Sequence, residues 1–342
     1  MTFLRLVQHA LHLNWYINRS SQVPLSSDLT QYLPLPDLAA VRILWPSRYS
    51  HPSGLFCLEM IKDALRRFVP VETRDICPND RTWHNRGGFP VPRDKADLIG
   101  TRCNPKSTHG ICGDIFEVQR ANQKIRCAYD YSDYPVVSTE IAQQVDLYFK
   151  CVSPNAVPGN VIPVGYFPSR PRLLAKARLK VLQRNPVRNI DVYGRFGAWT
   201  DSQPAREQLV TRMRQSSLRF RGGLHTAVFP AYLKDLMSAK IALEAPGQGP
   251  ITHRLPEAMA LGAVIVAAPP ACTLPEPLAD GIHYIATRED GSDVVEKCED
   301  LLRDETRLTS VASNAMGFFD RNFSPQSIAR RILCHALSPT NW

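Results

Sequence analysis

The stretch IALEAPGQGPITHRLPEAMALGAVIVAAPP, residues 241–270, decides the fold class of this chain. It predicts a buried strand at residues 240–244 and a loop rich in proline and glycine. An amphipathic helix then begins near Thr252 and ends at Gly262, where a second buried strand follows. Such a β-loop-α-β unit belongs to a parallel sheet and places ligands where the loop meets the helix, at the carboxyl ends of the strands.

The loop and the first helical turn have the composition of a phosphate-binding site. The loop contains Gly247 and Gly249, and the turn contains Thr252, His253 and Arg254. Small residues let a phosphate approach backbone N–H groups, and the turn adds unpaired donors, a positive dipole end and a guanidinium. Glu257, about one turn further on, suits hydrogen bonds from a vicinal diol such as a ribose. A first-turn carboxylate is also favoured by the dipole alone, but the flanking strands favour a nucleotide-sugar site.

Two segments carry a resemblance to a known family. RLPEAMALG at residues 254–262, followed by AVIV, resembles the donor-binding element of GT-B glycosyltransferases, which include exostosin-like and group 1 enzymes. NIDVYGRFG at residues 189–197 is similar to the first strand and glycine turn of the same donor domain. The resemblance implies an α/β fold with two Rossmann-like domains facing across a cleft, and a Glu257 that contacts the nucleotide ribose. Retaining group 1 enzymes carry a second glutamate where this chain has Gly249, so retention is not implied.

The length of 342 residues suits two domains. We expect an acceptor-side domain at residues 1–168, a basic linker helix at 169–188, a donor domain at 189–322, and a C-terminal helix at 323–342 that packs back on the first domain. The resemblance covers the C-terminal half closely and the N-terminal half in outline. At the turn of Gly194, Arg195 is a further candidate for binding phosphate.

Transfer to an acceptor hydroxyl needs a general base, which typically contributes 10²–10⁴-fold. Asp130 and Asp133 follow a strand expected at residues 125–130, at the sheet edge where α/β proteins bind ligands. His51 lies in the polar loop after a first strand expected at residues 42–46. These three residues are our candidates for the base, and a turn or capping role is the alternative for each aspartate.

The sequence predicts neither a metal nor a cofactor beyond the donor substrate. No Asp-x-Asp pair is present to chelate a metal on the diphosphate, so we expect the helix dipole and arginines to neutralise it. Cys77, His84, Cys103, His109 and Cys112 are zinc-ligand types within one irregular stretch. They include no C-x-x-C pair, which favours a chance collection over a zinc site.

The net charge of +9 is concentrated between residues 169 and 190, which hold seven basic residues and no acidic one. Arg172, Lys176, Lys180 and Arg184 recur at every fourth position, on one face of a helix. A solvated helix is the simple interpretation, and contact with an anionic membrane or acceptor is the alternative. No aromatic residues interleave with these charges, so nucleic acid is not the expected partner.

Nine cysteines without framework spacing indicate a reducing compartment, and no apolar run is long enough to span a bilayer. We therefore expect a cytoplasmic protein, with peripheral membrane contact as the alternative. The predicted function is metal-independent transfer of a hexose or deoxyhexose from a nucleotide-diphosphate sugar. The acceptor would be a glycan, a lipid-linked molecule or a small molecule. A nucleotide-sugar epimerase of the same fold and a non-catalytic binding protein are the alternatives.

Overall fold

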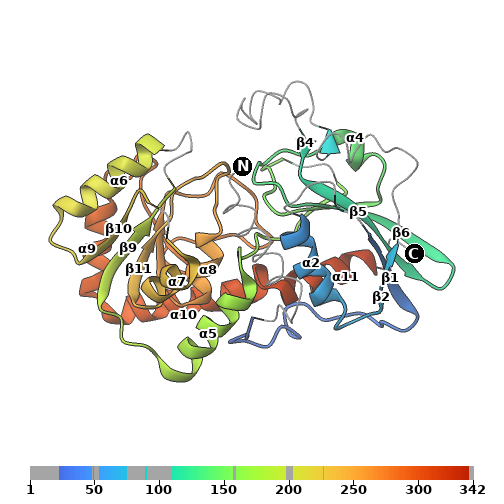
Figure 1. Cartoon of the computed structure of the whole chain (residues 1–342), viewed down its shortest axis with the longest axis horizontal. Coiled ribbons are helices and arrows are strands. Elements are labelled where there is room, and N and C mark those ends of the chain that lie inside the picture. Colours follow the sequence, from blue (N-terminus) through green and yellow to red (C-terminus); the bar gives the residue numbers. More distant parts are fainter. Residues whose placement is uncertain are drawn as a thin grey trace, which may run out of the picture.

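A computed structural model describes residues 23–47, 49, 54–74, 89–90, 110–156, 159–197, 203–225 and 227–338. Two sheets, each covered by helices, lie side by side (Figure 1). The chain completes all six strands of the first sheet before it enters the second, and its last helix returns to the first sheet (Figure 1). The described residues thus form an α/β protein with two large sheets, as the sequence predicts, and a small two-stranded sheet of β3 (Phe89–Pro90) and β4 (Gly110–Ile111).

The second sheet is parallel throughout, in the order β10-β9-β11-β12-β13. Its strands are β9 (Ile190–Arg195), β10 (Phe220–Gly223), β11 (Ala239–Leu243), β12 (Val264–Ala267) and β13 (Ile285–Ala286). The strand order reverses between β9 and β11. A doubly wound sheet binds ligands at such a point, beyond the carboxyl ends of the strands.

Helices cover both faces of this sheet, which is why its strands are almost continuously apolar. They are α6 (Gln203–Gln215), α7 (Phe229–Met237), α8 (Arg254–Ala260), α9 (Val294–Arg303) and α10 (Glu305–Asn322). On β9, Val192 joins the core beneath α6 and α9, while the adjacent Tyr193 joins the core beneath α7 and α8. Gly262, with φ +69°, ends the helical segment in the left-handed conformation expected of a stop glycine.

The first sheet is mixed, in the order β2-β1-β5-β6-β7-β8. Its strands are β1 (Val41–Pro46), β2 (Val71–Arg74), β5 (Gly113–Arg120), β6 (Gln123–Asp130), β7 (Leu147–Lys150) and β8 (Val161–Pro163). The sequence analysis expected β1 and β6, but it missed β5, which runs antiparallel to both of them.

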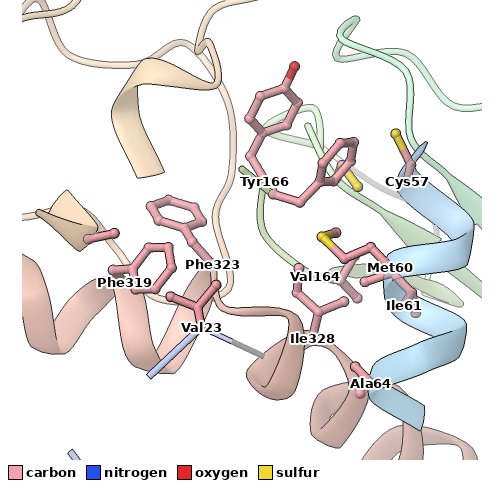
Figure 2. Packing of buried hydrophobic residues seen from close by; sticks show 14 of the residues in the cluster. Val23, Cys57, Met60, Ile61, Ala64, Val164, Tyr166, Phe319, Phe323 and Ile328 are labelled. Atoms are coloured by element: carbon pink, nitrogen blue, oxygen red, sulfur yellow. The ribbon is translucent and has the colours of Figure 1, made fainter. Parts of the chain in front are cut away.

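The two halves are connected by α5 (Pro171–Arg184) and by the return of α11 (Pro325–Ala336) onto α2 (Gly54–Leu65). Pro325 opens α11, and the Ser324 side chain caps it by accepting a hydrogen bond from the Ser327 N–H. Figure 2 shows Ile328 of α11 beside Met60 of α2 in a single buried cluster. The core of the first half is therefore completed by the C-terminal helix.

A buried ion pair joins segments that are distant in sequence. Arg178 of α5 pairs with Asp320 of α10 at 2.5 Å, and neither side chain is exposed. The same guanidinium donates to the carbonyl oxygens of Pro24 and Ala260, at 2.5 and 2.6 Å. Ser26 donates its N–H and its hydroxyl to Asp320. Arg178 thus lies in the basic run but belongs to the interior.

Candidate functional site

The candidate site lies where β9 and β11 end, at the reversal of the strand order. Arg195 is the last residue of β9, and Glu244 follows β11 directly. The glycine loop then leads into α8, which spans seven residues. The loop, the helix and both strand ends therefore meet at the position that the sequence predicts for the donor.

Glu244 occupies the entrance to α8. Its Oε1 accepts the Thr252 N–H at 2.9 Å, and its Oε2 pairs with Arg254 Nη1 at 3.0 Å. The sequence analysis assigned these two donors to a phosphate and missed Glu244. Its position, immediately after a buried strand, was the signal that could have identified it. Any anion bound here must use further donors, since one carboxylate already contacts the turn.

Three arginines converge on this position. Arg254 stacks 4.6 Å from the Phe196 ring centroid and donates to the Arg195 carbonyl oxygen at 2.5 Å. Arg206 of α6 stacks on the same ring at 5.7 Å and donates to the Gly197 carbonyl oxygen at 2.9 Å. The sequence analysis missed Arg206 because it lies in a polar helix outside any motif. Arg195 and Arg254 were predicted.

Arg206 differs from its neighbours because it has no ion pair among the described residues. It is only 4% exposed. Burial, followed by repulsion from Arg254, lowers the pKa of the Arg206 guanidinium. Arg195, in contrast, pairs with Asp235 at 3.5 Å. A buried cation is costly unless a counter-ion compensates it, so an anionic ligand would stabilise this arrangement.

The site also contains buried polar atoms that have no hydrogen-bond partner among the described residues. They include the Nε groups of Arg195, Arg206 and Arg254. Buried polar groups in folded proteins almost always have a partner. Several such atoms in one place indicate a ligand that carries hydrogen-bond acceptors.

The predicted glycines have different roles. Gly247 lies against Arg206: a Cβ at this position would come within 3.4 Å of Arg206 Nη2. A Cβ on Gly249 would overlap the Asp133 carbonyl oxygen, so glycine is needed for the first half of the chain to approach the loop. Gly194 lies inside β9, where the backbone of Gly222 approaches it closely. These contacts favour a packing role for Gly194.

Glu257 is 2% exposed and faces the segment that connects the two halves. Its Oε1 accepts the Ser169 N–H at 3.0 Å and the Ser169 hydroxyl at 2.6 Å. The sequence analysis did not identify Ser169, because a contact across 88 residues leaves no local pattern. One oxygen of the predicted ribose-binding carboxylate is thus held by the protein itself.

Asp133 and His253, predicted for different roles, are connected through Tyr166. The Tyr166 hydroxyl donates to Asp133 Oδ1, and the Tyr166 ring stacks on His253 at 4.8 Å between centroids. His253 Nδ1 lies 2.9 Å from the Phe167 carbonyl oxygen, where only a protonated nitrogen can form a bond. Together with the contact at Gly249, this arrangement places Asp133 beside the donor loop.

Asp130 is enclosed by hydrogen-bond donors and is fully buried. Lys150 Nζ, the Tyr148 hydroxyl and the Ser132 hydroxyl lie at 2.9, 2.6 and 2.7 Å from its carboxylate oxygens. A carboxylate with these contacts has a structural role, so they favour Asp133 over Asp130 as the base. His51, the third candidate, lies outside the described residues.

The proposed zinc ligands are mostly outside the described part of the chain. Cys112 alone of the five is described, and it is partly buried. No group of three metal-ligand side chains occurs in the described ranges. Seven cysteines in those ranges are free thiols. The expectation that these residues bind no zinc therefore stays a prediction.

Comparison with known proteins supports the predicted resemblance. Residues 170–334 match the family model described as "Glycosyl transferase-like". This part of the chain includes α5, the whole second sheet and most of α11, and it contains the arginines and Glu257. The predicted resemblance to glycosyltransferases is therefore confirmed for residues 170–334, and this part of the chain is glycosyltransferase-like.

Several solved structures are similar to this chain at low sequence identity. HepE from Anabaena, in complex with UDP and glucose, has 16% identity and a TM-score of 0.37. The match covers 58% of this chain and 65% of the HepE chain. HepE in complex with UDP-glucose has 13% identity and a TM-score of 0.41, and the match covers 87% of this chain and 99% of HepE. A glycosyltransferase from Rickettsia africae has 9% identity and a TM-score of 0.40, and the match covers 86% of this chain and 84% of the Rickettsia protein. No curated protein sequence is detectably similar.

Proposed function

We propose that this protein transfers a sugar from a nucleotide-diphosphate sugar to an acceptor hydroxyl. The observation that carries the proposal is Arg206, a buried guanidinium without an ion pair among the described residues, beside Arg254 and Gly247. A diphosphate supplies the missing negative charge and the acceptors for the unpartnered N–H groups. The glycosyltransferase-like match over residues 170–334 supports the same chemistry.

Each group has a role in the proposed reaction. Arg195, Arg206 and Arg254 stabilise the charge that develops on the leaving diphosphate, typically the largest catalytic effect. Glu257 binds the ribose. As the acceptor oxygen bonds to the anomeric carbon and the bond to the diphosphate breaks, Asp133 takes the acceptor proton. Asp133 is proposed because its backbone contacts the donor loop at Gly249.

Nucleotide release from a panel of nucleotide sugars tests this proposal. We expect wild-type protein to use at least one donor, and Arg206→Gln to lower kcat/KM about 30-fold or more, because hydrogen bonds to charged groups contribute about 1.5–3 kcal/mol each. Arg212→Gln is the matched control, since Arg212 is on the same helix but donates to the Asp290 carbonyl oxygen. Wild-type kinetics in Arg206→Gln would exclude the site. Release of free nucleotide with a 2-epimer would identify an epimerase instead.

Metal removal provides a separate prediction. If arginines neutralise the diphosphate, activity should survive EDTA with a modest loss at most. The measurement is transfer activity after dialysis against EDTA, with Mg²⁺ or Mn²⁺ added back. Complete inactivation that either cation reverses would show that a metal replaces the arginines in this role.

For the basic linker helix, we propose a peripheral contact with an anionic membrane surface. Lys180 and Arg184 are exposed on α5. Leu179 and Leu182, at 44% and 39% exposure, lie beside them, and Val187 follows at 84%. Exposed leucines among lysines and arginines suit an interface of anionic headgroups and acyl chains. No helix in the described ranges is long and apolar enough to span a bilayer.

Flotation with liposomes tests the membrane contact. Lys180→Gln/Arg184→Gln should bind vesicles of phosphatidylcholine and phosphatidylglycerol about 30-fold more weakly than wild type, at about 1 kcal/mol per basic residue near the surface. Added salt should weaken wild-type binding. Arg303→Gln is the control, because Arg303 is exposed but pairs with Glu299 and Asp300. Equal flotation of wild type and double variant would leave α5 as a solvated helix.

A further inference from the structure

Tyr166 lies in the segment that connects the two halves, between β8 and α5, and is only 2% exposed. Its hydroxyl donates a hydrogen bond to Asp133 Oδ1. Figure 2 shows this hydroxyl pointing away from the labelled apolar side chains of the cluster. Burial, followed by the charge of Asp133, raises the pKa of Tyr166, so the hydroxyl stays protonated and donates. Tyr166 is therefore a fixed donor to the carboxylate of the proposed base.

The Tyr166 ring is held from the donor side of the site. Its centroid lies 4.8 Å from the His253 ring, with 27° between the planes, and 5.2 Å from the Phe167 ring. His253 directly precedes α8, and its Nδ1 lies 2.9 Å from the Phe167 carbonyl oxygen. Stacked rings stabilise one another beyond the area that they bury. The position of the tyrosine is thus tied to the start of the donor helix.

The backbone on both sides of this contact is also fixed. Gly165, the residue before the tyrosine, has a φ of +86°, and a Cβ there would overlap the Asn322 carbonyl oxygen. On the other side, Lys150 Nζ donates to the carbonyl oxygen and the hydroxyl of Ser132, at 3.3 and 2.8 Å. Ser132 directly precedes Asp133, so the turn that carries the carboxylate is held by the first sheet.

One oxygen of Asp133 is left for an acceptor. Asp133 is partly exposed, and in the described ranges Tyr166 alone donates to its carboxylate, through Oδ1. We propose that Tyr166 is a positioning residue that directs Asp133 Oδ2 at the acceptor hydroxyl. Oδ2 takes the proton as the acceptor oxygen bonds to the anomeric carbon, and the electron pair of the broken bond leaves with the diphosphate. The inference rests on the proposed function, because it takes Asp133 as the base.

Nucleotide release from the sugar donor that the panel identifies, with water as the acceptor, tests this role. Tyr166→Phe keeps the stacked ring and removes the hydroxyl. We expect it to lower kcat about tenfold or more, because hydrogen bonds to charged groups are strong ones, and to keep KM for the donor within about twofold. Tyr284→Phe, which changes a buried tyrosine directly before β13, is the matched control and should keep the wild-type kcat.

A double-mutant cycle shows whether Tyr166 acts through the base. Asp133→Asn keeps an acceptor for the tyrosine and should lower kcat at least about 100-fold. Adding Tyr166→Phe to this variant should lower kcat by less than about twofold more, because the effects of residues that act as a unit are not additive. If Tyr166→Phe lowers kcat by the same factor in both backgrounds, it does not act through Asp133 and the proposal is wrong.

The stacking contact and a purely structural role give different results. His253→Ala should lower kcat more than His253→Phe does, because only phenylalanine keeps a ring against Tyr166. An equal loss in both variants would show that stacking does not hold the tyrosine. A purely structural Tyr166 would lower the melting temperature of Tyr166→Phe and leave kcat per folded molecule unchanged, which would overturn the positioning role.

Two further outcomes distinguish this role from the proposed function. If wild type releases nucleotide and either Tyr166→Phe or Asp133→Asn keeps the wild-type kcat, the positioning role is wrong and the donor site stands. If wild type releases no nucleotide from any sugar donor, the proposed function is wrong and the positioning role with it.

Discussion

Replacing Glu257 by alanine is expected to reduce kcat/KM at least about 100-fold with the preferred nucleotide sugar. The carboxylate is buried and would form charge-assisted hydrogen bonds to the ribose, each contributing about 1.5–3 kcal/mol. Two such bonds correspond to at least about 3 kcal/mol, hence the factor of 100. Initial rates over a range of donor concentrations measure this effect.

The control for this prediction is Glu257→Gln, which keeps the volume of the side chain and an acceptor for Ser169. It should fold like wild type and lose less activity than the alanine variant. If Glu257→Ala keeps wild-type kinetics, Glu257 does not take part in donor binding. A loss of activity accompanied by an equal loss of folded protein would assign Glu257 a structural role.

The largest effect on stability is expected at Arg178. Arg178→Ala leaves Asp320 as a buried charge without its cationic partner, and breaking such a pair costs about 3–5 kcal/mol. It also removes donors from the carbonyl oxygens of Pro24 and Ala260. The melting temperature, measured by calorimetry, should therefore fall by several degrees.

Two comparisons test this explanation. Arg184→Ala, on the exposed side of the same helix, should change the free energy of unfolding by less than about 0.5 kcal/mol. The double variant Arg178→Ala/Asp320→Ala should lose less stability than the two single variants lose together, because the effects of substituting both partners of one ion pair are not additive. If Arg178→Ala is as stable as Arg184→Ala, the explanation that a buried ion pair stabilises the fold is wrong.

The second half of the fold could be predicted from sequence because its signals are local. The strands of the parallel sheet are short apolar runs, and Gly262 ends the helix that the pattern in residues 241–270 predicts. Strand β5 was missed because GDIFEVQR mixes charged with apolar residues. Its pairing with β1 and β6 is a tertiary contact that propensity does not encode.

The candidate site was predictable only in part, for a similar reason. Glu257, Arg254 and Arg195 lie at characteristic positions of a β-loop-α unit, so a pattern reveals them. Arg206 and Ser169 reach the site from another helix and from the connecting segment, and no spacing identifies such residues. The structure brings them together, and it also shows the hydrogen bonds that enclose Asp130.

The return of α11 onto α2 has a consequence for how this chain folds on the ribosome. Domains generally fold as units while synthesis continues from the N-terminus. The buried face of α2, including Met60 and Ile61, packs in one cluster with Ile328 and Ile332 of α11. The apolar surface that α11 covers in the first half therefore stays exposed until almost the whole second half has been translated. During that interval the nascent chain would be a natural client for chaperones that bind exposed apolar segments.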